Sequence, residues 1–107
     1  MTAPSSDGWA ILRVAGEIDL ARMQELEDLI AANCNGNCPD TVVDLSDVGF
    51  MDSTGVAWLI RSRQLFHDRG RRLVLVVPTS LDRIFELSGL TETFAVHRSL
   101  EDATATP

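Results

Sequence analysis

The unbroken apolar run Leu73–Val77 constrains the fold of this chain more than any other feature of its sequence. The run is rich in β-branched residues and has no polar position, which is typical of a strand that is covered on both faces. Helices that flank a parallel sheet provide that cover. Pro78 ends the run, because proline cannot donate to a sheet ladder. The run therefore predicts a strand of an α/β fold.

The rest of the chain alternates between short apolar runs and segments with helical periodicity. We predict strands over residues 9–14, 41–45, 73–77 and 94–96, and helices over residues 20–33, 53–68 and about 79–87. Asp19 precedes the first helix, where its carboxylate could cap free N–H groups. A turn is expected over Ser46–Gly49, and Gly89 lies just beyond the third helix. This β-α-β-α-β-α-β order predicts a mostly parallel sheet with crossover helices.

The charge of the chain argues against nucleic acid as a partner. Sixteen acidic residues outnumber nine basic ones, so the formal net charge is −7, and an acidic surface repels phosphate backbones. Every basic residue is Arg, and the chain contains no Lys. A phosphoacceptor receiver domain and a P-loop ATPase each need a lysine beside the phosphoryl group, so both classes are excluded.

Ser53 follows one predicted strand closely and begins a predicted helix, as the nucleophile of a serine hydrolase can. The nucleophile elbow G-x-S-x-G needs glycine at position 51, and Met51 stands there. Neither His67 nor His97 has a carboxylate at a spacing that would indicate a catalytic base and its partner, so we do not expect an enzyme. His67 is expected on the surface, late in its helix.

Cys34 and Cys38 form a C-x3-C pair in a loop that contains Asn and Gly. Redox and zinc motifs use C-x2-C spacing, and no second pair completes a metal site. We therefore expect two reduced thiols in the cytosol and no bound metal. The alternative interpretation is a redox switch formed by these two thiols.

Two observations predict a cytoplasmic protein. The N-terminal sequence MTAPSSDG has neither a basic start nor an apolar signal core. The longest apolar runs, Val56–Ile60 and Leu73–Val77, are too short to cross a bilayer. We therefore expect no direct membrane insertion.

The segment over residues 42–55 carries the most informative pattern of the chain. We expect Phe50 and Met51 to anchor a turn in the core. Ser53 would then lie at or beside the N-cap of a helix, with its hydroxyl near free backbone N–H groups. From the residues alone, a simple capping role for Ser53 stays open, with Asp52 complementing the helix dipole.

Three short motifs follow one another along the chain. They are Gly16-Glu17-Ile18-Asp19, then Asp44-Leu45-Ser46 with Phe50-Met51-Asp52-Ser53-Thr54-Gly55, then Phe85-Glu86-Leu87-Ser88-Gly89-Leu90. On these motifs, the chain resembles the STAS family of anti-sigma factor antagonists, a group of bacterial switch proteins. The resemblance implies a single STAS-like α/β domain with a four- or five-stranded, mostly parallel sheet and three to four helices. We place this domain at residues 9–100, between a short N-terminal segment (1–8) and a flexible C-terminal tail (101–107).

The resemblance also implies a partner-switching mechanism. In the family, the serine directly after the aspartate of the D-S-S/T-G turn is the phosphoacceptor, and it corresponds to Ser53. The GELD-type segment of the family contributes to the partner surface and corresponds to a segment that ends in Asp19. The unphosphorylated protein would bind an anti-sigma factor that is often also a serine kinase, and so free a sigma factor. Phosphorylation would end this interaction, a phosphatase would restore it, and ATP would be bound by the partner kinase, so no cofactor of the chain itself is implied.

Trp58 and Leu65 project from the predicted helix opposite to its core side. A neighbouring helix could cover them, but we favour an exposed strip that serves as a docking surface, because Trp is a typical interface anchor. We expect Trp58→Ala to weaken partner binding and leave folding intact. The predicted partner-binding residues are therefore Asp19, Asp52, Ser53, Thr54, Gly55 and Trp58.

Two other functions stay open. A STAS accessory subunit of a membrane transporter ATPase would not need to be phosphorylated, and the scaffold of a stress-signalling complex could be built from such domains. The intact turn Asp52-Ser53-Thr54-Gly55 favours the anti-sigma factor antagonist.

Overall fold

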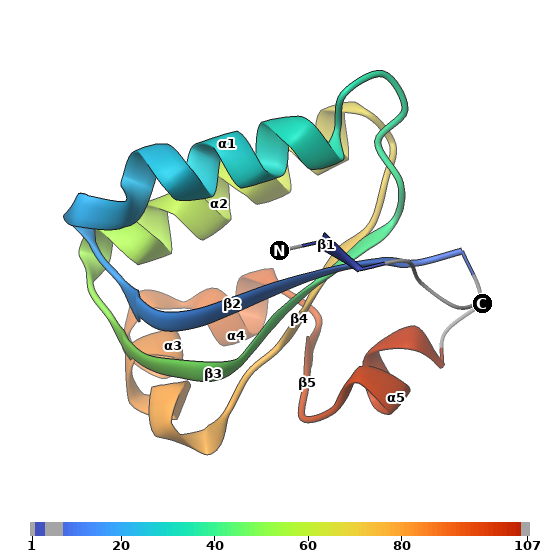
Figure 1. Cartoon of the computed structure of the whole chain (residues 1–107). Helices are drawn as coiled ribbons and strands as arrows, with labels where there is room; N and C mark the ends of the chain where they lie inside the picture. Colours follow the sequence, from blue (N-terminus) through green and yellow to red (C-terminus); the bar gives the residue numbers. More distant parts are fainter. Residues whose placement is uncertain (1, 4–7, 106–107) are drawn as a thin grey trace.

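The computed structural model describes residues 2–3 and 8–105, which form a five-stranded sheet packed with helices (Figure 1). The strands are β1 (Thr2–Ala3), β2 (Ala10–Ile18), β3 (Thr41–Met51), β4 (Leu73–Val76) and β5 (Val96–His97), and they lie in that order. The α-helices are α1 (Met23–Asn33), α2 (Ser53–Asp68), α3 (Asp82–Ser88), α4 (Leu90–Thr93) and α5 (Leu100–Thr104). Two 3-10 turns, η1 (Leu20–Arg22) and η2 (Thr79–Leu81), lead into α1 and α3. β1 pairs with β2 antiparallel and the other pairs are parallel, which confirms the predicted α/β class and mostly parallel sheet.

The run Leu73–Val77 is buried along its whole length, as predicted. Leu75 contributes to the larger core cluster, which the sheet shares with α1, α2 and α3. Val74 and Val76 contribute to a second cluster with Ala103 of α5. Successive side chains of a strand point to opposite faces, so the absence of polar positions in this run follows from cover on both faces.

β3 is longer than the sequence indicates. The expected turn at Ser46–Gly49 is wrong, because these residues continue β3, in which Asp47 and Val48 pair in parallel with β2. The Asp44 carboxylate accepts hydrogen bonds from the Ser46 N–H at 3.0 Å and the Ser46 hydroxyl at 2.6 Å. This local bond accompanies an irregular register, so the strand bends without ending.

The segment expected to form the C-terminal tail begins with a short helix. Residues 101–104 belong to α5, and the Ser99 hydroxyl caps this helix by accepting from the Asp102 N–H at 3.1 Å. Ala103 is buried against the sheet. Residues 106–107 of the predicted tail lie outside the described residues, as do residues 1 and 4–7 of the predicted N-terminal segment.

The structure joins Cys34 and Cys38 in a disulfide, and both side chains are buried. Their Cα atoms lie 4.1 Å apart. Gly36 adopts a φ of +88°, which allows the loop to turn back on itself. The structure thus pairs the two cysteines, unlike the expectation of two reduced loop thiols.

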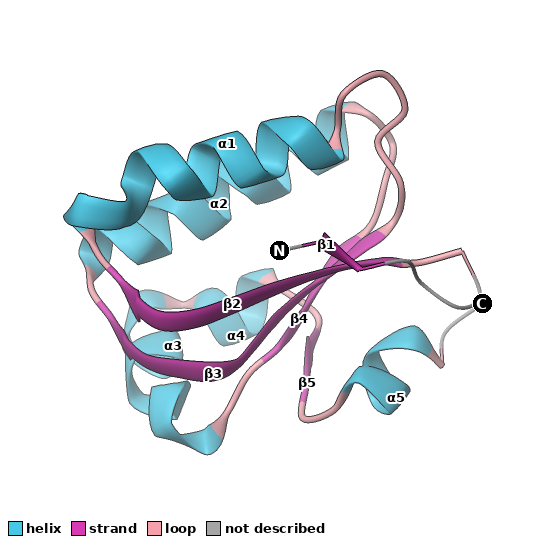
Figure 2. Ribbon diagram, in the orientation of Figure 1, coloured by secondary structure: helices cyan, strands magenta, loops and turns pink. Residues whose placement is uncertain are grey.

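Trp58 is buried between α1 and α2, which lie side by side (Figure 2). Its side chain is 1% exposed and belongs to the larger core cluster. Leu65 is half-buried against the same cluster. The predicted exposed strip through Trp58 is therefore wrong, because α1 covers this side of α2. Within the part of the chain that the structure describes, no helix has the length and apolar character that a membrane span requires.

We predict that Trp58→Ala lowers the free energy of unfolding by about 3–5 kcal/mol, because it removes a large buried side chain and leaves a cavity. Ile60→Ala is the matched control, since Ile60 lies in the same helix and is 47% exposed; its cost should stay below about 1 kcal/mol. Urea denaturation followed by circular dichroism measures both. Equal midpoints for the two variants would contradict the burial of Trp58.

Candidate functional site

Ser53 is the first residue of α2 and lies at the edge of the sheet where β2 and β3 end. Ile18 and Met51 are the last paired residues of these two strands. The Asp52 N–H donates to the Ile18 carbonyl at 3.2 Å, so the turn into α2 is tied to the end of β2. The carboxyl ends of parallel strands meet at one edge, and this edge therefore carries Asp19 and Asp52 together, each directly after its strand.

Asp52, not Ser53, caps α2. One oxygen of the Asp52 carboxylate accepts from the Thr54 N–H at 2.9 Å, the Gly55 N–H at 3.3 Å and the Thr54 hydroxyl at 2.5 Å. The Thr54 hydroxyl, followed by the backbone N–H groups, holds the pKa of the Asp52 carboxyl below its usual value. Asp52 is therefore a negative charge fixed beside Ser53 at neutral pH.

The Ser53 hydroxyl is left free by this cap. Ser53 is exposed, and its hydroxyl makes no hydrogen bond to any residue that the structure describes. A merely capping role for Ser53 is thus excluded, because Asp52 performs it. The neighbouring Thr54 hydroxyl is half-buried and already donates to Asp52. Of the two hydroxyls, only that of Ser53 belongs to an exposed residue and is not engaged in a hydrogen bond.

Gly55 brings the start of α2 into close contact with the strands. It is buried, and a Cβ atom there would lie 2.7 Å from both Ile18 Cγ2 and Met51 Cγ. Those distances are far inside van der Waals contact, so no other residue fits without a shift. Gly55 therefore positions the turn by packing, and its burial does not support the direct partner contact that the sequence suggested.

Asp19 is half-buried at the end of β2 and does not cap the helix that follows it. Its side chain makes no capping hydrogen bond to η1, and Oδ1 is buried with no partner among the described residues. The predicted capping role is wrong.

Arg22 is a feature of this edge that the sequence reasoning missed. Its Nη1 donates to the Ala15 carbonyl at 2.5 Å and the Glu17 carbonyl at 2.9 Å, and its Nη2 pairs with Glu25 at 2.8 Å. The hydrogen bond to Glu25, with a further contribution from the charge of Asp19, raises the pKa of Arg22. The two carbonyls flank Gly16, where φ is +85° and the pairing with β3 is irregular. Arg22 thus fixes the irregular end of β2. The spacing of three residues between Arg22 and Glu25 is typical of an ion pair on a helix, and it was the one sign of this arrangement in the sequence.

Exposed apolar side chains lie at this edge and beside it. Leu20 is 74% exposed directly after Asp19, and Leu87 of α3 is 76% exposed. Phe50 is 50% exposed, so the predicted anchoring role in the core is wrong for Phe50 and right for the buried Met51. Phe50 and Leu87 line one hollow of the surface, and Arg83 lies on the same hollow. We call the set Asp19, Leu20, Phe50, Asp52, Ser53 and Leu87 the Ser53 face.

The described part of the chain contains no group of three or more His, Cys, Asp or Glu side chains arranged to hold a metal ion. His67 is exposed in the last turn of α2, as predicted. The Ser53 face thus combines one free hydroxyl, two carboxylates and exposed apolar side chains, which suits protein recognition.

Comparison with known proteins identifies the family. The family model described as "Mlab, STAS domain" matches residues 1–100. The chain belongs to the STAS domain family. It is similar to the anti-sigma-B factor antagonist of Staphylococcus aureus, with 28% identity over 98 residues that cover 91% of each chain. The resemblance drawn from the three motifs is thereby confirmed.

Two solved structures resemble this STAS domain. An anti-sigma factor antagonist from Mycobacterium paratuberculosis has a TM-score of 0.80 and 31% identity, over 96% of this chain and 89% of that one. The phosphorylated form of the Bacillus cell fate determinant SpoIIAA has a TM-score of 0.71 and 20% identity, over 96% of this chain and 94% of that one. The second likeness shows the fold alone.

We predict that Gly55→Ala lowers the free energy of unfolding by about 1–3 kcal/mol, because its methyl group would overlap Ile18 and Met51. Gly49→Ala is the matched control: a Cβ atom there meets nothing within 4 Å, so its effect should stay within about 1 kcal/mol. Thermal unfolding of the two variants tests the difference. If Gly55→Ala is as stable as Gly49→Ala, the close approach of α2 to the strands is not a constraint.

Proposed function

We propose that this STAS domain is an anti-sigma factor antagonist whose binding is controlled by phosphorylation of Ser53. The unphosphorylated protein binds an anti-sigma factor through the Ser53 face and so frees a sigma factor. The observation that carries the proposal is the exposed, unengaged Ser53 hydroxyl at the start of α2, beside the charged cap Asp52. The names of the similar proteins from Staphylococcus and Mycobacterium support the choice of partner.

Phosphorylation would change the charge of the Ser53 face far more than its shape. A phosphate adds about −1.5 to −2 charges, next to Asp52 and close to Asp19 at an edge that is already acidic. Asp52 and not Ser53 caps α2, so a phosphate on Ser53 would break no structural hydrogen bond and the fold should survive. A partner packed on the face would have to desolvate the new charge, which costs a few kcal/mol and weakens binding strongly.

The apolar members of the Ser53 face explain how the unphosphorylated form could bind. Leu20, Phe50 and Leu87 are exposed on this face, and apolar side chains with a polar rim are typical of the centre of a protein interface. Three of the four large apolar residues that are exposed in the described chain lie on this face, and Ile60 is the fourth. The binding energy would thus come from groups next to the hydroxyl that controls it.

The partner proteins would catalyse both the addition and the removal of the phosphate. The chain has no lysine and no phosphate-binding loop, so ATP would be bound by an anti-sigma factor that is also a serine kinase. A phosphatase would remove the phosphate from Ser53. In this proposal the chain is a substrate and a binding module, not an enzyme.

We predict that a cognate kinase and ATP add one phosphate to the wild-type chain and none to Ser53→Ala. Thr54→Val is the control for the second hydroxyl, and it should still be phosphorylated because the Thr54 hydroxyl is held by Asp52. Intact mass and fragment mapping measure both the number and the position of the phosphates. Phosphate on Thr54, or on Ser53→Ala, would overturn the assignment of Ser53. Binding to a transporter ATPase without any phosphorylation would favour the accessory-subunit alternative.

A further inference from the structure

A hollow of 310 Å³ lies between the end of β3 and the helical segment of η2 and α3. Figure 1 shows α3 next to the end of β3, the strand that leads into α2. The buried Met51 and Leu81 contribute to the hollow, and the exposed Phe50 and Leu87 belong both to it and to the Ser53 face. We call it the α3 hollow, and its lining residues are Gly49, Phe50, Met51, Ser80, Leu81, Arg83, Ile84 and Leu87.

Arg83 is the only charged residue in the lining of the α3 hollow. It is exposed, and its guanidinium makes no hydrogen bond or ion pair with any residue that the structure describes. The carboxylate of the neighbouring Asp82 pairs with Arg98 at 2.8 Å, so it does not neutralise Arg83. The hollow thus combines an apolar floor with a free positive charge, in a chain whose net charge is −7.

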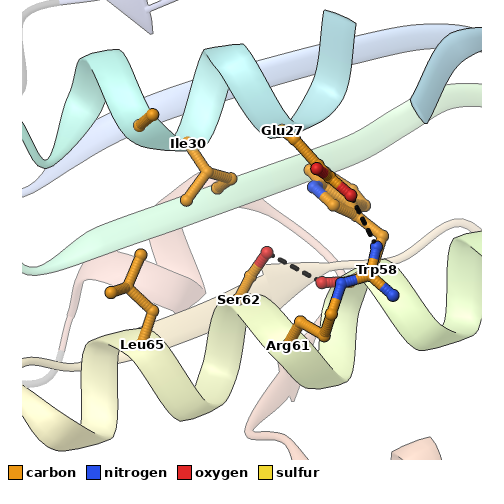
Figure 3. Close-up of a pocket in the computed structure, with 7 residues that line it drawn as sticks. Glu27, Ile30, Trp58, Arg61, Ser62 and Leu65 are labelled. Atoms are coloured by element: carbon orange, nitrogen blue, oxygen red, sulfur yellow. Dashed lines mark hydrogen bonds and ion pairs between the residues drawn. The ribbon is translucent and has the colours of Figure 1, made fainter. Parts of the chain in front are cut away.

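The groove between α1 and α2 has no such free charge (Figure 3). Arg61 of α2 pairs there with Glu27 of α1 at 2.9 Å, so each charge neutralises the other. The Ser62 hydroxyl in the same groove donates to the Trp58 carbonyl at 2.8 Å. Of these two surfaces, only the α3 hollow has a cation that a partner could pair with.

The shape and charge of the α3 hollow indicate what can occupy it. A small-molecule site usually encloses most of its ligand, whereas Phe50 and Leu87 leave this hollow open to the solvent. An open hollow that continues the Ser53 face suits a side chain that protrudes from another protein. An apolar cavity of about 150 Å³ in another protein holds one benzene molecule, so the α3 hollow has room for a bulky apolar side chain. Arg83 favours a carboxylate beside that side chain, because a guanidinium binds a carboxylate through two parallel hydrogen bonds.

We propose that the α3 hollow receives an apolar side chain of the anti-sigma factor, and that Arg83 pairs with an Asp or Glu carboxylate beside it. This inference rests on the proposed function and adds the chemistry of the surface that the partner must present. Asp19 and Asp52 on the Ser53 face would attract basic groups of the partner, whereas Arg83 would attract an acidic one. Charges of both signs fix the orientation in which a partner docks, and they disfavour a partner of uniform charge.

The absence of lysine from the chain provides a direct test. Arg83→Lys introduces the only lysine and keeps the positive charge. A water-soluble carbodiimide joins an amine to a carboxylate in contact with it: an amide bond forms, and the carbodiimide takes up the water that is lost. With a purified anti-sigma factor that binds the wild-type chain, Arg83→Lys should give a covalent product. Peptide mapping should place the cross-link between position 83 and an Asp or Glu of the anti-sigma factor.

Arg71→Lys is the matched control for the cross-link. Arg71 is exposed and also makes no side-chain hydrogen bond or ion pair with a described residue. It precedes β4, which starts beside the start of β3, so it lies at the opposite edge of the sheet from the α3 hollow. Arg71→Lys should therefore give no cross-link to the anti-sigma factor above background.

Charge reversal at the same two positions measures the contribution to affinity. Arg83→Glu should raise the Kd for the anti-sigma factor about tenfold or more, because it places a carboxylate against a carboxylate. Arg71→Glu changes the net charge equally and should change the Kd by less than about twofold. Both residues are exposed, so both variants should keep the melting temperature of the wild-type chain within a few degrees.

The inference is overturned if Arg83→Lys gives no more cross-link than Arg71→Lys, or if Arg83→Glu binds as tightly as the wild-type chain. A cross-link from position 83 to a second copy of the chain would also overturn it, because the occupant would then be a different one. Ser53→Asp tests the proposed function separately. Weaker binding of Ser53→Asp with unchanged binding of Arg83→Glu would remove the α3 hollow from the interface and leave the phosphorylation switch in place. A wild-type chain that binds no anti-sigma factor would overturn both.

Discussion

The parallel pairing of β2 with β3 is the constraint on which the rest of this structure depends. It carries both strands to a common end at Ile18 and Met51, and it places an aspartate directly after each strand. Gly55 allows α2 to begin in contact with those strand ends, and the Asp52 N–H fastens the turn to Ile18. The position of Ser53 is thus set by the backbone hydrogen bond of Asp52 and by the packing of Gly55.

Asp52 caps α2 and Ser53 does not, which explains how Ser53 can be modified without loss of the helix. An N-cap contributes about 1 kcal/mol, and here Asp52 supplies it through the Thr54 and Gly55 N–H groups. Ser53 therefore has no structural hydrogen bond to lose when a phosphate is attached. The same cap supplies a fixed negative charge beside the phosphate. Under the proposed function, stability and regulation would be carried by adjacent side chains with separate roles.

The sequence predicted most of the elements because their signals are local. The apolar run Leu73–Val77 and the helix over residues 53–68 appear where periodicity placed them. The continuation of β3 through Ser46–Gly49 could not be predicted from the sequence, because pairing with β2 overrides the turn propensity of this stretch. Whether α1 covers Trp58 also depends on how two helices pack, which periodicity of one helix does not determine. At the site, motif order selected Ser53 as the candidate phosphoacceptor, which stays a prediction. The exposure of Phe50 and the hydrogen bonds of Arg22 to two carbonyls follow only from the three-dimensional arrangement.

The most direct test of the central claim is a calorimetric titration of one anti-sigma factor with the chain in two states, unphosphorylated and fully phosphorylated on Ser53. The account predicts that phosphorylation weakens binding by about 30-fold or more, which corresponds to a few kcal/mol of repulsion and desolvation, while the melting temperature of the chain alone stays within a few degrees. Equal affinities of the two states for that anti-sigma factor would contradict it. So would a phosphorylated chain that has lost its fold, because the effect would then be unfolding and not a change of charge on an intact surface.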